Sequence, residues 1–443
     1  MASVKKETLE SQFEENGQQS RTIKVKDSLH WFPAFFHIFK GNVGAGTLAL
    51  PFAFKCSGWL LGSLIYITIV FLAQIAINQL LWSSRRNRSS DGSVLDYGEL
   101  VESVCAKSRH ARLNKCSRIA KLFTNLCLAL CQYGFCTIYI LFVSQSIKKI
   151  LHYNCLGPNV DVRFIIVSVY LPFLSINFVK KLSIIAYFSE IATIFLILGL
   201  GIIFRTTVMG TFHDISRLPP IGNNISIFFG AILYAIEGIG VILPIEKKMK
   251  SAKQCALVSN AAYAAVFLLY YFFGIIGYNY FGNYIQESIS FNLTNSVAAQ
   301  FENVFLALAV FFTFPIQFYV PKSFIFPKIY RIFNKDALEH EPIPNFLNNT
   351  LIIFNIAILT IFAVSIPYLA LFMSFLGCTC CTYLALTAPA LLHLISYDNI
   401  NKSCNFTKFL WISYDLFVVL VSVVSGSIGL LSVLDKLAEI YSK

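Results

Sequence analysis

The chain has 443 residues, of which 56% are hydrophobic and only 13% are charged. A soluble domain carries about 25% charged residues, so this composition excludes a soluble globular enzyme, a disordered protein and a coiled coil. The formal net charge is +12. Cytosolic loops of membrane proteins are enriched in Lys and Arg, and this enrichment explains the positive charge without nucleic-acid binding.

Apolar segments of about 18 residues or more recur from Leu29 to the C-terminus, which indicates an all-α polytopic membrane protein. A transmembrane β-barrel would show short alternating segments instead. We predict eleven transmembrane helices, at residues 31–56, 58–82, 119–147, 163–179, 182–205, 225–245, 256–281, 298–321, 347–366, 368–396 and 409–434.

The regions that flank this helical domain (29–434) are short and polar. Residues 1–28 mix both charges with few apolar side chains, which predicts a disordered cytosolic tail. No apolar core follows the first basic residues, so no cleavable signal peptide is expected. Residues 435–443 form a short extracytosolic C-terminus in this scheme, and a short amphipathic helix is predicted at 97–106.

Lys and Arg determine the expected orientation, because cytosolic loops of membrane proteins are enriched in them. They concentrate in the loops that are cytosolic when the N-terminus is inside, above all in 83–118. This orientation places the polar loop 282–296 outside. Asn292 begins an Asn-Leu-Thr triplet there and is a candidate glycosylation site.

Two predicted helices carry sequences that weaken a helix near their midpoints. The first contains GNVGAG (Gly41 to Gly46), and the sixth contains AIEGIG (Ala235 to Gly240). Glycine lowers helix propensity, and backbone groups freed inside a membrane need protein, water or ligand as partners. Close helix packing through glycine is the alternative interpretation.

The two weakened helices are five apart in order, which favours an inverted-repeat transporter with its site between them. Free N–H groups at a break suit a carboxylate, and free carbonyls suit an ammonium group or a cation. An amino acid carries both charges. The predicted substrate-binding residues are Gly41, Asn42, Val43, Gly44, Ala45, Gly46, Tyr234, Ala235, Ile236 and Gly238.

His37 and Glu237 are the ionisable candidates for carrying a proton. His37 lies one turn before Gly41 and titrates near neutral pH, but a histidine hydrogen-bonded at a helix interface fits equally well. Glu237 could hold a proton, or it could fix the broken helix by accepting backbone hydrogen bonds. Its place in the EGIG turn favours the structural role.

The twelve cysteines do not form the pattern of a disulfide framework. The CTCC cluster (Cys378 to Cys381) lies within an apolar segment, so we expect small packing residues rather than a metal site. No metal cluster, catalytic triad or nucleotide-phosphate loop is present, so neither an enzyme nor an ATP-driven pump is expected.

The segments HIFKGNVGAGTLALPFAFKCSGW (His37 to Trp59) and FFGAILYAIEGIGVILPIEKKMK (Phe228 to Lys250) resemble the proton-coupled amino acid transporter family of the amino acid/auxin permease group. The resemblance implies a LeuT-type fold, with inverted repeats at about 31–205 and 225–396 and an extra helix at 409–434. It further implies symport of a proton with small neutral amino acids of the glycine, alanine and proline type, and no other cofactor. Members act at the plasma membrane or in endosomal and lysosomal membranes.

The chain departs from the family pattern in two places. Members of the mammalian type join the loops after spans 3 and 7 by a disulfide. Cys155 matches its first position, but the loop 282–296 contains no cysteine. Ala45 replaces a Thr or Ser that is common in the first-helix motif, which could shift the substrate preference.

Two other functions remain open on the sequence. The basic loop 83–118 and the N-terminal tail would suit an amino acid sensor that acts through protein–protein contacts, and a sodium-coupled transporter would share the same fold. The expected partners are small neutral amino acids, the proton and the lipid bilayer, while protein partners are not indicated.

Overall fold

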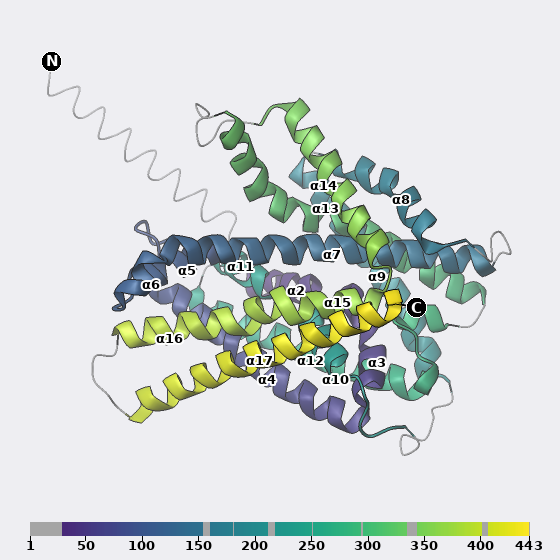
Figure 1. Ribbon diagram of the computed structural model, residues 1–443, viewed down its shortest axis with the longest axis horizontal. Coiled ribbons are helices and arrows are strands. Elements are labelled where there is room, and N and C mark those ends of the chain that lie inside the picture. Colours follow the sequence, from purple (N-terminus) through teal and green to yellow (C-terminus); the bar gives the residue numbers. More distant parts are fainter. Residues whose placement is uncertain are drawn as a thin grey trace.

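The computed structural model describes residues 29–153, 160–179, 181–210, 218–249, 251–293, 296–334, 343–400 and 406–442. The predicted tail 1–28 and Cys155 lie outside these residues. The described part is helical and contains no strand beyond an isolated bridge between Leu29 and Met249. Most of the long helices run along the long axis of the molecule (Figure 1).

The first half of the chain forms a helical hairpin, a pair of short helices and three further helices, of which the first and the last are long. In chain order they are α2 (Trp31–Asn42), α3 (Ala45–Ser57), α4 (Trp59–Arg86), α5 (Tyr97–Ala106), α6 (Ala111–Lys115), α7 (Ser117–Tyr153), α8 (Val162–Asn177) and α9 (Leu182–Val208). The short helix α5 coincides with the amphipathic helix predicted at 97–106. The side chain of Glu99 accepts the Asp96 N–H at 3.3 Å, which caps its start.

The second half begins with another interrupted helix. In chain order it contains α10 (Ile225–Ala235), the 3₁₀ turn η2 (Ile239–Val241), α11 (Ile242–Lys248), α12 (Ala252–Phe281), η3 (Gly282–Tyr284), η4 (Ile289–Asn292), α13 (Val297–Phe333), α14 (Asn345–Ser365), α15 (Leu369–Leu376), the π-helical η5 (Gly377–Cys381) and η6 (Tyr383–Thr387), α16 (Ala388–Ile400) and α17 (Phe406–Ser442).

Nine helices among the described residues are long and apolar enough to cross a membrane, by length and composition. The first and fourth predicted spans do not meet that length, because the first is divided into α2 and α3 and α8 has only 16 residues. Large apolar side chains such as Phe71, Ile194 and Leu420 are exposed. That outer surface suits lipid.

Two helices extend beyond their predicted ends. α13 continues to Phe333 although it contains Pro315, Pro321 and Pro327, and α17 continues to Ser442, through most of the predicted C-terminal tail. Proline removes one hydrogen bond each time but does not end a helix that neighbours support. α13 packs most extensively against α9 and α7. α13 therefore extends well beyond the predicted span 298–321.

The interrupted helices lie at the centre of the molecule. α10 packs against α3 and α15, α12 packs against α2 and α3, and α16 and α17 cover α4 and α10. α8, α13 and α14 lie on the opposite side of the long α7 (Figure 1). The two helix interruptions are therefore enclosed by helices from both sides.

The end of the molecule near α5 and α11 is held by polar contacts. The Leu29 N–H, just before α2, donates to the Lys248 carbonyl at the end of α11 at 2.9 Å. The buried carboxylate of Glu246 accepts from Arg88 at 2.7 Å and from Ser84 at 2.8 Å. These bonds join the ends of α2, α11 and α4.

Candidate functional site

The first interruption is two residues long. α2 ends at Asn42 because Val43 (φ −75°, ψ 110°) and Gly44 (φ −160°, ψ −150°) are extended, and α3 resumes at Ala45. The Thr47 N–H still reaches the Gly44 carbonyl at 3.1 Å. The first N–H groups of α3 and the last carbonyls of α2 have no regular partner within the helices. Among these carbonyls, that of Phe39 accepts the Val43 N–H at 3.1 Å.

The second interruption is longer and carries a carboxylate. α10 ends at Ala235, where Ile236 leaves the helical conformation (φ −89°, ψ 2°), and α11 begins only at Ile242 after a 3₁₀ turn. Glu237 lies within it and is 7% exposed. Both interruptions fall within the glycine-containing segments that the sequence singles out.

The two interruptions touch each other. A Cβ atom on Gly46 would lie 3.0 Å from the Cα of Ala235 and 3.3 Å from Cε1 of Tyr234. A Cβ atom on Gly238 would overlap the side-chain amide of Asn42. A Cβ atom at either position would force these neighbours to shift, so both glycines have a packing role in addition to any ligand-binding role.

Tyr270 of α12 joins the carbonyl groups on the two sides of this contact. Its hydroxyl lies 2.5 Å from the Asn42 carbonyl and 3.2 Å from the Ala235 carbonyl, and the side chain is fully buried. The sequence analysis did not single out this residue. Its partners precede it by 228 and 35 positions, so no local pattern reveals the bond.

Three buried polar atoms beside the interruptions form no hydrogen bond of regular geometry within the described part of the chain. They are Oδ1 of Asn42, Oγ1 of Thr47 and the hydroxyl of Tyr263. The Tyr263 hydroxyl nevertheless lies close to the Asn42 side chain, and the Tyr270 hydroxyl lies close to Thr47. Buried polar groups in proteins are almost always satisfied by protein or water. These atoms are therefore suited to contact a polar ligand or ordered water at the break.

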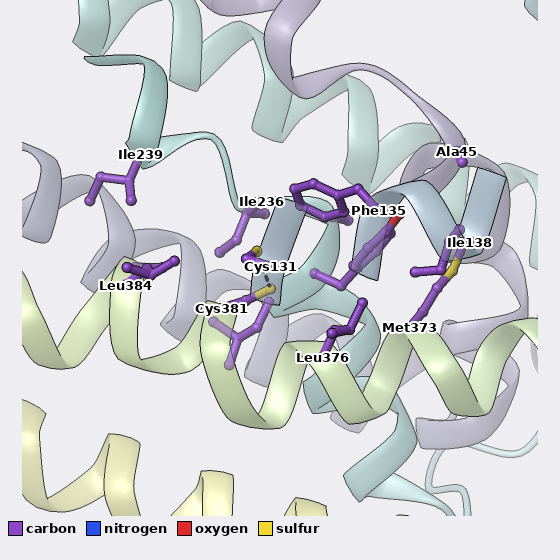
Figure 2. Close-up of a cluster of buried hydrophobic side chains, with 14 of the residues drawn as sticks. Ala45, Cys131, Phe135, Ile138, Ile236, Ile239, Met373, Leu376, Cys381 and Leu384 are labelled. Carbon is purple, nitrogen blue, oxygen red and sulfur yellow. Dashed lines mark hydrogen bonds between the residues drawn. The ribbon is translucent and has the colours of Figure 1, made fainter. Parts of the chain in front are cut away.

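Apolar side chains line the region next to the break. The rings of Tyr234 and Phe135 meet edge to face, with centroids 5.0 Å apart. Figure 2 shows Phe135 and Ile236 above the helix that carries Met373 and Leu376. These side chains are buried. The arrangement leaves a polar backbone flanked by an apolar wall.

The CTCC segment lies on this wall, in the widened π-helical turn η5. The thiols of Cys131 and Cys381 are 3.5 Å apart (Figure 2), and all the described cysteines are free. Among the residues described, no group of three or more His, Cys, Asp or Glu is placed to hold a metal ion.

The two predicted proton carriers occupy different environments. Glu237 is buried, forms no ion pair within the described part of the chain, and lies within hydrogen-bonding reach of the Cys131 thiol. His37 is exposed on α2, where Lys40 and Lys248 are the charged groups acting on it. Of the remaining site predictions, Gly41 is exposed, whereas Asn42, Val43 and Ala45 are buried.

Asn292 is engaged in its own loop. Its Oδ1 accepts the Gln286 N–H at 2.6 Å, and its Nδ2 donates to the Tyr284 carbonyl at 2.8 Å. Attachment of a glycan at Nδ2 would require this conformation to open. Thr294, the last residue of the triplet, lies outside the described residues.

Comparison with known proteins identifies the family to which this chain belongs. The sequence profile of the family described as "Transmembrane amino acid transporter protein" matches residues 27–433. The chain belongs to this family, the amino acid/auxin permease family. It is a multi-pass membrane protein of a transporter family, and neither the family nor its similar relatives are enzymes.

Two curated relatives cover most of the chain. The "Proton-coupled amino acid transporter-like protein pathetic" of Drosophila melanogaster is 28% identical over 396 residues, which is 85% of this chain and 78% of that protein. The "Amino acid transporter AVT3A" of Arabidopsis thaliana is 28% identical over 381 residues, covering 82% and 81%. These relatives support amino acid transport as the general function.

A solved structure supports the fold. The structure titled "Inward facing conformation of Mhp1" superposes with a TM-score of 0.54 at 11% identity, covering 91% of this chain and 90% of that one. The all-helical LeuT-like architecture is thereby confirmed as the general fold.

Proposed function

We propose that this protein is a secondary active transporter that moves small neutral amino acids together with a proton. The observation that carries this proposal is the contact between two interrupted helices, which brings the first N–H groups of α3 and the last carbonyl groups of α2 and α10 together beside the buried side chains of Asn42, Thr47 and Tyr263. The N-terminus of α3 suits a carboxylate, and the carbonyls at the ends of α2 and α10 suit an ammonium group.

The limited space at the contact favours small substrates. Gly46 lies against Tyr234 and Ala235, and Phe135 packs on the Tyr234 ring. A side chain of the glycine, alanine or proline type would fit beside this apolar wall. Ala45, which replaces a hydroxyl-bearing residue of the family, adds to the apolar character.

Proton coupling is proposed through Glu237. A carboxylate that is buried without a cationic partner is costly in its charged form, and binding a proton removes that charge. The name of the Drosophila relative, which refers to proton coupling, supports the same choice. His37, one turn before the first interruption and exposed, is proposed as a group through which protons reach the break.

The proposed topology follows the basic residues. The end of the molecule that carries α5, α6 and the start of α7 (Figure 1) would face the cytosol, together with the N-terminus. The opposite end carries the loop 282–293. Residues 31–205 and 225–396 would form the inverted repeats, and α17 would lie outside them. The membrane would be the plasma membrane or that of an endosomal or lysosomal compartment.

Transport in proteoliposomes tests this function. Uptake of labelled glycine, alanine and proline would be measured with acidic or neutral pH outside, and with sodium present or absent. Uptake that rises with an inward proton gradient and ignores sodium is the expected result. Uptake that needs sodium would overturn the proton assignment. Binding without any uptake would favour the sensor function instead.

Two substitutions refine the test. Glu237→Gln should remove the dependence of uptake on the proton gradient, because the neutral amide cannot take up the proton. Glu190→Gln is the matched control, since Glu190 is an exposed carboxylate on α9. If Glu237→Gln behaves like the control, the proton binds elsewhere.

A further inference from the structure

The segment between α12 and α13 forms a compact cap, which we call the 282–293 loop. It contains the short turns η3 and η4. Ile285, Ser288, Ile289 and Ser290 within it are buried, with exposed fractions of 1% or less. Burial of this kind in a loop shows that it packs down on other parts of the molecule rather than projecting from it.

Three helices that flank the candidate site hold this loop. Lys55 at the end of α3 donates to the Ile285 carbonyl at 3.1 Å. Lys149 near the end of α7 donates to the Ser290 carbonyl at 2.7 Å and the Leu293 carbonyl at 3.3 Å. α3 begins at the first interruption and α7 carries Phe135, so the loop closes over the ends of helices that line the site.

The third contact is different because its titratable group belongs to the loop itself. Oε2 of Glu287 accepts the N–H of Leu369, the first residue of α15, at 2.8 Å. The first N–H groups of a helix have no partner within the helix, so an external acceptor stabilises them. The carboxyl group therefore fastens the loop to the start of α15.

The surroundings of Glu287 contain few charges. Lys55 and Lys436 act with Glu287 on the Cys56 thiol, so these two cations face the same region. Lys55 is bonded to the Ile285 carbonyl and Lys436 to Oδ1 of Asn224 at 2.6 Å. Glu287 forms no ion pair within the described part of the chain. Burial raises the pKa of its carboxyl group, and the N–H groups of Ala370 and Leu369 oppose that rise.

The raised pKa of the Glu287 carboxyl group makes opening of the loop depend on pH. When the loop lifts, the carboxyl group enters water and its pKa returns to the ordinary value. A group with a higher pKa in the closed form binds its proton more tightly there, so acid favours the closed form and rising pH favours the open form. A protonated carboxyl group keeps a carbonyl oxygen, so the Leu369 N–H retains its acceptor.

We propose that Glu287 is a second proton-binding site, outside the substrate site, and that its protonation closes the 282–293 loop over the ends of α3, α7 and α15. The ligand of the site is the proton. The role of this site in coupling rests on the proposed proton symport. If the outer side of the carrier closes only after Glu287 binds a proton, the transport cycle cannot be completed without that proton.

A cysteine reporter tests the proposal without any transport assay. The Ser288 side chain is fully buried and its hydroxyl has no partner among the described residues, so Ser288→Cys is a nearly isosteric probe of loop lifting. The purified full chain would be labelled in detergent with a charged methanethiosulfonate, at pH 5 to 8. The rate of labelling at position 288 would be divided by the rate of labelling at the exposed Cys116. This ratio corrects for the effect of pH on thiol ionisation.

The expected result is a rate ratio that rises with pH and reaches a plateau. Each unit by which the carboxyl pKa in the closed form exceeds that in the open form changes the open fraction about tenfold. Glu287→Gln, neutral at every pH, should keep the low ratio throughout. Gln286→Glu, which adds an exposed carboxyl group one position away, should leave the wild-type pH dependence unchanged.

A rate ratio that is constant from pH 5 to 8 in the Ser288→Cys chain would overturn the proposal, even if the Glu287→Gln chain fails to fold. The outcome is independent of the proposed function. A pH-dependent ratio combined with sodium-driven uptake would overturn proton symport and keep the loop site. A constant ratio combined with proton-driven uptake would overturn the loop site and keep proton symport.

Discussion

Nδ1 of His393 in α16 lies 2.7 Å from Oδ2 of Asp415 in α17, and Oδ1 of the same carboxyl group accepts from Gln79 of α4 at 2.6 Å. Asp415 is 1% exposed and His393 is 5% exposed. Three helices therefore meet at one buried polar network. The rings of Trp82, Tyr397 and Trp411 surround the imidazole.

We expect Asp415→Ala to destabilise the folded protein strongly, because it leaves both His393 and Gln79 without their buried acceptor. Removing one partner of a buried pair costs about 3–5 kcal/mol. The midpoint of thermal unfolding in detergent measures the effect. Asp398→Ala is the control, since the Asp398–Lys408 pair is more exposed and such pairs contribute about 0–1 kcal/mol. Equal shifts for both variants would contradict the prediction.

Tyr270→Phe should weaken substrate binding while leaving the fold intact. The substitution removes the hydroxyl that holds the carbonyls of Asn42 and Ala235 in place. A lost buried hydrogen bond of about 1.4 kcal/mol corresponds to roughly a tenfold rise in KM. The control is Tyr271→Phe. The Tyr271 hydroxyl donates to Oγ of Ser63 over 3.2 Å, and this bond does not involve the interruptions. An unchanged KM in Tyr270→Phe would show that the break does not need this support.

Gly377→Ala should reduce the yield of folded protein. A Cβ atom at this position would overlap the carbonyl group of Gly230, so α10 and the π-helical η5 could not keep their contact. Overpacking of this kind costs about 1–3 kcal/mol or more. Gly201→Ala in α9 is the matched control, because its Cβ would meet nothing within 4 Å. Size-exclusion chromatography and thermal unfolding distinguish the two outcomes.

His37→Gln should lower the rate of proton-driven uptake without abolishing the dependence on the gradient. His37 is exposed and lies among Lys40 and Lys248, whereas Glu237 is buried in the interruption itself. A group that passes protons onward changes the rate, while the group that binds them determines the coupling. Initial uptake rates at several external pH values provide the measurement. Complete loss of coupling in His37→Gln would contradict this prediction and assign proton binding to His37 instead of Glu237.

The positions of the interruptions could be predicted because glycine acts locally. The segments 41–46 and 235–240 contain the observed ends of α2 and α10, at Asn42 and Ala235. The family was likewise recognisable from these two segments. Sequence periodicity also placed most helices within a few residues of their observed bounds.

Contacts between distant positions could not be predicted in this way. Tyr270 is one of 21 tyrosines, and only the packing of α12 against α2 identifies its partner. The Gln79–Asp415 bond and the Glu287–Leu369 bond join helices or loops that are remote in the chain. The end of α13 was misplaced for a related reason, since proline signals a helix end only where neighbouring helices do not support it.

The bonds that join the ends of α2, α11 and α4 also constrain how the molecule can move. Leu29 is tied to Lys248, and Glu246 is tied to Arg88 and Ser84. A displacement of any one of these helix ends breaks hydrogen bonds unless the other two follow. The three helix ends therefore form one mechanical unit. A conformational change that opens a path from the centre of the molecule in that direction has to displace all three together.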